Sequence, residues 1–488
     1  MLSSVVFSAV VPAACGAVVG GIMVLLAYAY LLRPEKRRVK VVETKLNAVM
    51  SDFDKMVKHL DGLPKAESAA REPFELGRAA MAAFKWDEAI AHFREAMKGA
   101  EGTQLAALFN LIGLCQFASD RPVDALRDYE ESARLAEEFG DKQGKAADLG
   151  NIGNIYSAKN EPDKALKYYE EALVIHREIA HQPGVASQLG NIGNIYSTKG
   201  ELDKALKYYE EALAIHREIG YQPGAANQLA NIGLIYSAKG ELDKALKYHE
   251  EALAIHREIG YQRGVANQLG KIGGIYSARG ELDKALKYHE EALAIDREIG
   301  HERGVANDLG NIGLIYSAKG EPDKALKHYD EALVIDRRIG YQPGVASQLG
   351  RIGLVYSARG EPDRALMYGV ESLASYRDIA YQPGVASALG NVGNAYVRTM
   401  QMKTSTSSML NRSDQVDALA KNAIEYLVPA LQMLLEMGIA DGPKQCLWGL
   451  RECCKVLGRE RFVSECVRAG MSKKQAEGLA EEQPEATE

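Results

Sequence analysis

The most constraining feature of this sequence is a stretch of forty residues that returns along the chain with few changes. Residues 149–180 read LGNIGNIYSAKNEPDKALKYYEEALVIHREIA, and residues 189–220 read LGNIGNIYSTKGELDKALKYYEEALAIHREIG. The same theme begins again at residues 229, 269, 309 and 349. A fixed period in this range is typical of folds in which one small structural element stacks on the next. We therefore expect an array of repeats rather than a single globular core.

Each repeat has the apolar pattern of two helices. Apolar side chains recur three and four positions apart over residues 184–196 and again over residues 205–215, which is the spacing of one helix face. Gly200 separates the two patterns, and the second pattern ends near Gly220. Proline and glycine are adjacent in residues 221–224 (YQPG), so we expect a turn there. Neither helix can cover its apolar face alone, and successive repeats must stack.

Small and aromatic residues recur at fixed places in the repeat. One copy carries them at Gly193, Tyr196, Gly200, Ala205, Tyr209 and Ala212, and the copy before it at Gly153, Tyr156, Ala165, Tyr169 and Ala172. This pattern resembles the tetratricopeptide repeat, in which small residues let helices approach closely and aromatic residues fill the space between repeats. The resemblance covers residues 74–398 and implies an all-α fold, a right-handed solenoid of about 8–9 helix-turn-helix repeats.

The repeat is forty residues long, whereas a tetratricopeptide repeat commonly has about 34. This longer form, together with residues 139–142 (FGDK) and 149–154 (LGNIGN), resembles the repeats of Pins-type G-protein-signalling modulators. Those proteins continue into G-protein-binding motifs, which this sequence lacks. The resemblance therefore does not imply a G-protein partner.

The resemblance also implies a binding site. In similar families the first helices line a concave groove, where asparagines three residues apart hydrogen-bond the backbone of a bound peptide. A side-chain amide both donates and accepts, so a column of asparagines can follow a peptide of any sequence, and two cations in the column could pair with its carboxylates. Duplication of the repeat would copy its asparagines too, and this alternative stays open. The predicted peptide-binding residues are Asn151, Asn154, Asn191, Asn194, Asn227, Asn231, Asn267, Lys271, Asn307, Asn311, Arg351, Asn391 and Asn394.

The N-terminal segment, residues 1–32, contains no charged side chain and consists mostly of Val, Ala, Leu and Gly. About 20 apolar residues span a bilayer, so this segment predicts a transmembrane anchor. A cleaved signal peptide, with its site near residues 27–29 (AYA), is the alternative. Basic residues follow within residues 33–40, which places the N-terminus outside and the repeats in the cytoplasm. We expect a single-pass membrane protein.

Two features near the N-terminus favour a homodimer. Small residues recur along the apolar segment, where they would let two membrane helices pack closely. Residues 42–63 place apolar side chains alternately four and three positions apart, which is typical of a coiled coil, although a single amphipathic helix packed on the first repeat explains the same spacing. The predicted membrane dimer face comprises Ala13, Gly16, Ala17, Gly20 and Gly21.

The chain after the anchor divides into five further segments. A solenoid needs atypical end repeats whose outer face tolerates water, and an acidic segment of low hydrophobicity does not fold alone. The predicted segments are a basic juxtamembrane and heptad helix at 33–64, the solenoid at 74–398, a polar loop at 399–413, capping helices at 414–470 and an acidic disordered tail at 471–488.

Composition and motifs limit the chemistry of this protein. The net charge of −7 is spread over the helices, so no basic face predicts nucleic-acid binding. The six cysteines lack the spacing of a zinc site or a disulfide framework, which favours buried thiols. His176, His216 and His256 recur one repeat apart, too far to share a metal ion, and we expect them on an exposed helix surface. No catalytic motif is present, so we expect no enzyme, cofactor or metal.

These observations together predict a membrane-anchored scaffold or adaptor that binds a segment of a partner protein in its groove. One alternative is a membrane assembly or import receptor, or a co-chaperone, with many weak clients. Another is a self-assembling structural array, built through the small residues of the anchor, the heptad helix and the nearly identical repeats.

Overall fold

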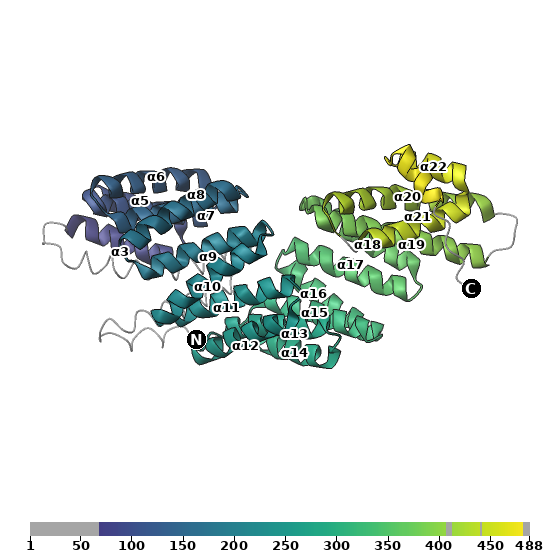
Figure 1. Ribbon diagram of the computed structural model, residues 1–488, viewed down its shortest axis with the longest axis horizontal. Helices are drawn as coiled ribbons and strands as arrows, with labels where there is room; N and C mark the ends of the chain where they lie inside the picture. The colour runs from purple at the N-terminus through teal and green to yellow at the C-terminus, as the bar shows by residue number, and fades with distance from the viewer. Residues whose placement is uncertain (1–67, 407–411, 440–441, 482–488) are drawn as a thin grey trace, which may run out of the picture. The chain divides into compact units, whose positions relative to one another are not determined.

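The computed structural model describes residues 68–406, 412–439 and 442–481. In this part of the chain the secondary structure consists of 21 helices and contains no strand (Figure 1). The predicted all-α fold is thus confirmed. The chain divides into two compact units, Met1–Gly260 and Tyr261–Glu488.

Paired helices make up most of both units, each pair being a first helix followed by a second helix. The pairs of the first unit are α3 (Ser68–Ala82) with α4 (Trp86–Met97), α5 (Gly102–Ala118) with α6 (Pro122–Glu138), α7 (Lys142–Ala158) with α8 (Pro162–Glu178), α9 (Gln182–Thr198) with α10 (Leu202–Glu218), and α11 (Gln222–Ala238) with α12 (Leu242–Glu258). Those of the second unit are α13 (Gln262–Ala278) with α14 (Leu282–Glu298), α15 (Glu302–Ala318) with α16 (Pro322–Arg338), α17 (Gln342–Ala358) with α18 (Pro362–Asp378), and α19 (Gln382–Thr406) with α20 (Arg412–Glu436), followed by α21 (Gly442–Leu457), α22 (Arg459–Arg468) and α23 (Lys473–Glu481).

A residue with left-handed backbone follows each helix of the regular repeats. After α9 this residue is Gly200, whose φ is 76°. Its N–H donates to the carbonyl of Ser197 (3.1 Å), and the N–H of Glu201 donates to the carbonyl of Tyr196 (2.9 Å). This pair of bonds satisfies carbonyls at the helix end and reverses the chain. Glycine is frequent at these positions because it has no β-carbon to clash in this conformation.

The proline–glycine pairs that predicted turns lie inside helices instead. Pro223 stands in the first turn of α11, where its missing N–H leaves no hydrogen bond unmade. A β-carbon on Gly224 would lie 2.6 Å from the ring of His216 in α10, so this glycine makes room for a buried imidazole. The turn predicted over residues 221–224 is therefore wrong, and the chain reverses at Gly220 and Tyr221.

Glycine and tyrosine positions hold each repeat together. A β-carbon on Gly193 would lie 2.7 Å from the ring of Tyr209, so the first helix can lie against this ring only without a side chain there. Tyr209 is buried, and it belongs to an apolar cluster with Leu229 and Ile232 of the next repeat. The predicted function of the aromatic residue, to fill space between repeats, is confirmed, and the ring also fills the space within its own repeat.

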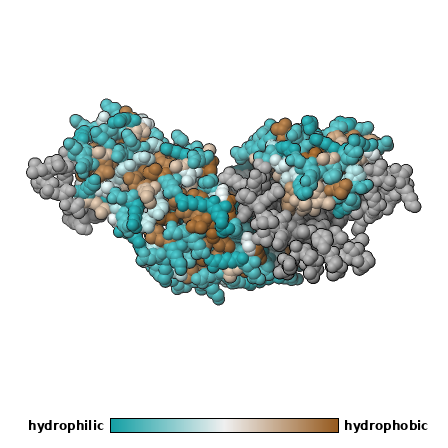
Figure 2. All heavy atoms as spheres, turned by 180° about the vertical axis from the view of Figure 1, so that it is seen from behind, coloured by the Kyte–Doolittle hydropathy of each residue, from teal (hydrophilic) through white to brown (hydrophobic). Residues whose placement is uncertain are grey.

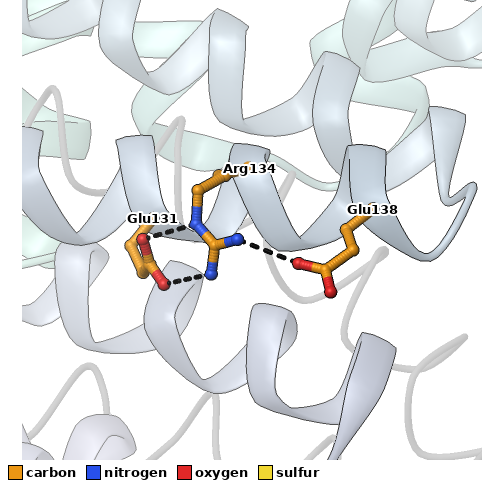
Figure 3. A network of polar contacts seen from close by, with 3 residues as sticks. All are labelled: Glu131, Arg134 and Glu138. Carbon is orange, nitrogen blue, oxygen red and sulfur yellow. Dashed lines mark hydrogen bonds and ion pairs between the residues drawn. The ribbon is translucent and has the colours of Figure 1, made fainter.

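Charged side chains cover the second helices. On α6 the guanidinium of Arg134 pairs with Glu131 (2.7 Å) and Glu138 (2.9 Å), one turn away on either side (Figure 3). Hydrophilic side chains dominate the face drawn in Figure 2, and hydrophobic ones gather in smaller areas. Exposed pairs of this kind stabilise a fold little. Much of the charge of the protein thus lies on the second helices.

The C-terminal helices differ from the prediction. Helix α19 continues to Thr406 and α20 begins at Arg412, so the polar loop predicted at residues 399–413 is wrong over residues 399–406 and 412–413. Arg398 donates to the carbonyl of Ser357 (3.1 Å), and the buried Met400 joins a core cluster, which holds this extension in place. Helix α23 likewise occupies part of the predicted disordered tail, with Ala476 buried. Residues 407–411 and 482–488 lie outside the described residues.

No membrane-spanning helix occurs in the part of the chain that the structure describes, since no helix there is both long and apolar enough. This finding contradicts, for the described helices, the predicted single-pass localisation with the repeats in the cytoplasm. The regular helices have 17 residues, fewer than the roughly 20 that a span needs, and the 25-residue α19 and α20 carry charged residues. The segment 1–32, with the dimer face predicted in it, and the heptad helix lie outside the described residues.

Candidate peptide-binding face

Each regular first helix exposes one stripe of side chains. In α15 this stripe contains Asn307, Asn311 and Leu314, whereas Leu309 and Ile312 between them are buried. Spacings of four and three residues keep a set on one side of a helix. We call this set the first-helix stripe, with its members in first, second and third position. All the residues predicted to bind a peptide occupy one of these three positions on their helix.

First helices of successive repeats contact each other. In the first unit α5 contacts α7 and α7 contacts α9, and in the second unit α13, α15, α17 and α19 form a continuous row. Helices that pack directly lie about 8–10 Å apart. The stripes within one unit therefore lie side by side. Helix α21 packs on α19 and extends the row, an arrangement that the irregular C-terminal sequence did not reveal.

The third-position asparagines of the first unit bond to the protein itself. The Tyr169 hydroxyl donates to Oδ1 of Asn154 (2.9 Å), and the Tyr209 hydroxyl donates to Oδ1 of Asn194 (2.7 Å). These bonds satisfy the hydroxyls of tyrosines that lie deep in each repeat. They occupy the amide oxygens and leave the amide N–H groups as the donors open to a ligand.

Asn394 differs from the other third-position asparagines because α21 covers it. A β-carbon on Gly449 of α21 would lie 2.7 Å from Oδ1 of Asn394. Among the described residues this buried oxygen has no hydrogen-bond partner. Asn394 is therefore placed against a neighbouring helix and away from an open stripe.

A row of buried polar residues supports the stripes, and the sequence interpretation missed it. Gln188 lies three residues before Asn191, whose amide Nδ2 donates to its side-chain oxygen at 3.4 Å. The Gln188 amide fills the space above Gly150 of α7, because a β-carbon there would lie 2.8 Å from Nε2. The equivalent polar residues Gln228, Asp308 and Gln348 are also buried. The sequence did carry a signal for this row: a polar residue recurs at one position of most first helices, on the same helix face as buried apolar residues.

Asp148 occupies the same supporting position in α7, where it is almost completely buried. Its Oδ1 lies 2.5 Å from Nδ2 of Asn110 in α5. Burial raises the pKa of the Asp148 carboxyl to about 8, although the hydrogen bond from Asn110 acts in the opposite direction. The acid is thus held largely protonated at neutral pH, and it resembles in charge the neutral Gln188 of the next repeat.

Two cations replace asparagine in the second stripe position. Lys271 of α13 is exposed, whereas Arg351 of α17 is partly buried. Nη1 of Arg351 lies 2.6 Å from the point where a β-carbon on Gly310 would stand, and the guanidinium carbon lies 6.0 Å from the centre of the Tyr329 ring. The side chain therefore reaches from α17 back across α15. Burial lowers the pKa of the Arg351 guanidinium.

Leucines occupy the third stripe position of other repeats. Leu234, Leu314 and Leu354 expose 42%, 43% and 50% of their surface, although each lies in a helix with a well-packed opposite side. These leucines stand where other repeats have an asparagine such as Asn194. Together with the asparagines they make a mixed polar and apolar face.

The histidines expected on an exposed surface are buried. His176, His216 and His256 are 3%, 6% and 3% exposed, and the aspartates that replace them in later repeats, Asp296 and Asp336, are buried too. The glycine in the first turn of the next first helix lies against four of these side chains, namely His176, His216, Asp296 and Asp336. That prediction was wrong, because a variable residue type was taken as a sign of exposure. Burial, with His181 nearby, lowers the pKa of His176 to about 4.

Comparison with known proteins agrees with the fold of paired helices. Residues 103–178, 184–258 and 264–338 match a family model described as tetratricopeptide repeat. No curated protein sequence matches the chain.

Three solved structures similar to this chain are each less than 25% identical to it, so they bear on its fold alone. The quorum sensor NprR from B. thuringiensis is 17% identical, with a TM-score of 0.53, over 73% of this chain and 99% of that one. A signal-transduction ATPase with a tetratricopeptide-repeat sensor, from Pyrococcus horikoshii, is 16% identical, with a TM-score of 0.54, over 76% and 55%. BtubC from P. vanneervenii is 24% identical, with a TM-score of 0.42, over 46% and 92%.

The family match and the structure agree on the same helix pairs. Each matched stretch contains two first and two second helices with the small and aromatic residues at their expected places. Residues 103–178, 184–258 and 264–338 of this chain are therefore tetratricopeptide repeats, a fold for protein–protein interaction.

Proposed function

We propose that this protein is an interaction scaffold that binds a segment of a partner protein along its first-helix stripes. The observation that carries the proposal is the stripe itself. In several repeats it presents a side-chain amide at the second position, among them Asn191, Asn231 and Asn311. An amide can satisfy both the N–H and the C=O of a bound backbone.

The chemistry of the stripe supports a polypeptide ligand. Asparagine is unfavourable inside a helix because it competes for backbone hydrogen bonds, yet it recurs here on the partly exposed side of regular helices. In Asn154 and Asn194 the N–H groups remain available while the oxygens accept from tyrosines. These asparagines would therefore act as donors to a peptide carbonyl, and the second-position asparagines as both donors and acceptors.

The likeness to Pins-type repeats belongs to this proposal. It rests on residues 139–142 and 149–154 and on the forty-residue period. It favours a signalling adaptor over an enzyme, since such repeats bring proteins together and supply no reactive group of their own.

The test compares partner capture by the full chain and by a triple variant, Asn191→Ala, Asn231→Ala and Asn311→Ala. Alanine favours a helix more than asparagine does, so the variant is expected to stay folded, as circular dichroism would verify. A partner crosslinked by the wild type, identified by mass spectrometry and lost from the triple variant is the expected result. The matched control changes Lys207, Lys247 and Lys327 of the second helices to alanine and should retain the partner. Equal capture by all three proteins would refute the proposal.

A further inference from the structure

Basic side chains gather on the first helices of the second unit. The acidic residues of α13, α15 and α17, within the described chain, are Glu302, which pairs with Arg338 of α16, and Asp308, which is buried. The protein as a whole has a net charge of −7. This row is therefore opposite in sign to the rest of the molecule. Its basic residues are Arg263, Lys271, Arg303 and Arg351.

Two of these cations have no acidic partner. No carboxylate among the described residues forms an ion pair with Lys271 or Arg351, although Asp336 is near enough to influence the charge of Arg351. In contrast, Arg303 donates to the Tyr341 hydroxyl (3.0 Å) and lies over its ring. A guanidinium that reaches across α15 and forms no ion pair with a carboxylate of the described residues suits a carboxylate that arrives with a ligand.

Two exposed leucines belong to the stripes of α15 and α17, which the Arg351 side chain joins. Leu354 follows Arg351 by three residues on the same stripe, and Leu314 occupies the equivalent position on the contacting helix α15. Directly packed helices lie about 8–10 Å apart, so these leucines are separated by about that distance. In an extended polyproline-II segment, side chains three residues apart point the same way and lie about 9 Å apart. The spacing of the leucines thus fits two apolar side chains of one extended segment.

We propose that the stripes of α13, α15 and α17 bind an acidic, extended polypeptide segment. It places two apolar side chains, three residues apart, on Leu314 and Leu354, and a carboxylate between them on Arg351. Lys271 meets a second acidic residue further along. The inference rests on the function proposed above and names the chemistry of its partner. The leucine pair favours a polypeptide over a nucleic acid, whose phosphate backbone offers no apolar side chain to bury.

The test measures binding of short fluorescein-labelled peptides to the full chain by fluorescence anisotropy. The probe GSGLESLEGSG has leucines three residues apart with a glutamate between them, and GSGLQSLQGSG is its uncharged counterpart. The glutamate probe is expected to bind at least ~10-fold more tightly, as a charge-assisted pair requires. Equal affinity for the two probes, or no binding of the glutamate probe at 1 mM, would overturn the proposal. If a single-stranded oligothymidine displaces the probe and binds more tightly, the proposal is overturned, and the ligand of this site is a nucleic acid and not a peptide.

Variants that copy other repeats locate the site. Arg351→Asn introduces the residue that Asn311 already provides in the preceding repeat. It should reduce the preference for the glutamate probe to the part that Lys271 contributes, while leaving the affinity for the glutamine probe unchanged. The double variant Leu314→Asn and Leu354→Asn introduces the residue that Asn194 provides at this stripe position. It should lower the affinity for both probes equally, by ~10-fold. Arg377→Asn on α18 removes the same charge away from the stripe and should change neither.

The outcomes separate this inference from the broader function. In one outcome the asparagine triple variant no longer captures the partner, while neither Arg351→Asn nor the leucine changes alter probe binding. That outcome would overturn the acidic-segment inference and leave the scaffold function standing. If capture does not respond to the asparagine variant but probe binding depends on Arg351, the role of the second-position asparagines would be overturned and the acidic-segment site would stand.

Discussion

Replacing Asp148 by asparagine is expected to stabilise the first unit, and by more as the pH rises. The carboxyl is buried between α5 and α7 with Nδ2 of Asn110 at 2.5 Å. Its pKa in the folded protein lies near 8, above the ordinary value of 3.8, chiefly because of burial. A group whose pKa is raised by folding contributes its stability at low pH and loses it as the pH rises through the folded value. An amide in its place has no proton to lose.

The size of the effect follows from this pKa. Each tenfold change in proton affinity corresponds to about 1.36 kcal/mol. Relative to a neutral residue, the acid should therefore lower the free energy of unfolding by ~2 kcal/mol at pH 5, ~4 kcal/mol at pH 7 and ~6 kcal/mol above pH 8. These are upper values, because local opening of the contact between α5 and α7 lets water reach the carboxylate at a lower cost.

Urea unfolding of the full chain between pH 5 and 8.5 measures this difference. In a Trp448→Phe background the fluorescence of Trp86 reports on the apolar cluster that joins α4 to α5. The difference in unfolding free energy between Asp148→Asn and the parent should grow by about 1 kcal/mol per pH unit. Asp163→Asn, an exposed aspartate paired with Lys199, is the control and should not show this slope. A difference that is constant with pH, or a variant less stable throughout, would refute the reasoning.

Three further predictions follow from the helix ends, the helix contacts and the cysteines. Ala180 has a φ of 52° where the next four repeats have glycine, so Ala180→Gly should stabilise the protein by ~1 kcal/mol, measured as a higher urea midpoint. Gly193→Ala should destabilise by ~1–3 kcal/mol because its β-carbon would meet the Tyr209 ring, whereas Gly274→Ala, with nothing within 4 Å, should be neutral or stabilising. Among the described cysteines, the half-exposed Cys454 should be alkylated first by iodoacetamide at pH 7.5, as followed by mass spectrometry. Burial raises the pKa of the others strongly, namely Cys115, Cys446, Cys453 and Cys466.

The repeat fold could be predicted from sequence because its information is local and is repeated. The period set the number of helix pairs, and helical spacing placed Asn307 and Asn311 on one stripe of α15. Helix ends could be placed from glycines such as Gly200, because left-handed backbone favours that residue. The same local logic failed for Pro223 and Gly224, since a proline–glycine pair also suits the first turn of a helix when a neighbouring side chain needs the space.

The candidate residues could be assigned to one helix face from sequence, whereas their hydrogen-bond partners could not. Periodicity identifies which residues share a face, but the hydrogen bond from Tyr209 to Asn194 joins two helices, and no spacing within one helix reveals it. The covering of Asn394 by α21 depends on a helix whose sequence has left the repeat pattern. The unmatched charge of Arg351 likewise depends on which acidic residues its neighbours bring near.

The amino-acid sequence by itself determined that this chain is all-α, where most of its helices begin and end, and which residues face outward on each first helix. Each of these properties depends on residues within one or two helical turns. The tertiary structure decided which polar groups are satisfied from within, how deeply His216 and Asp148 are buried, and which side chains keep a free donor or charge. Those properties depend on contacts between helices, where a single glycine opposite a ring or an imidazole decides what fits.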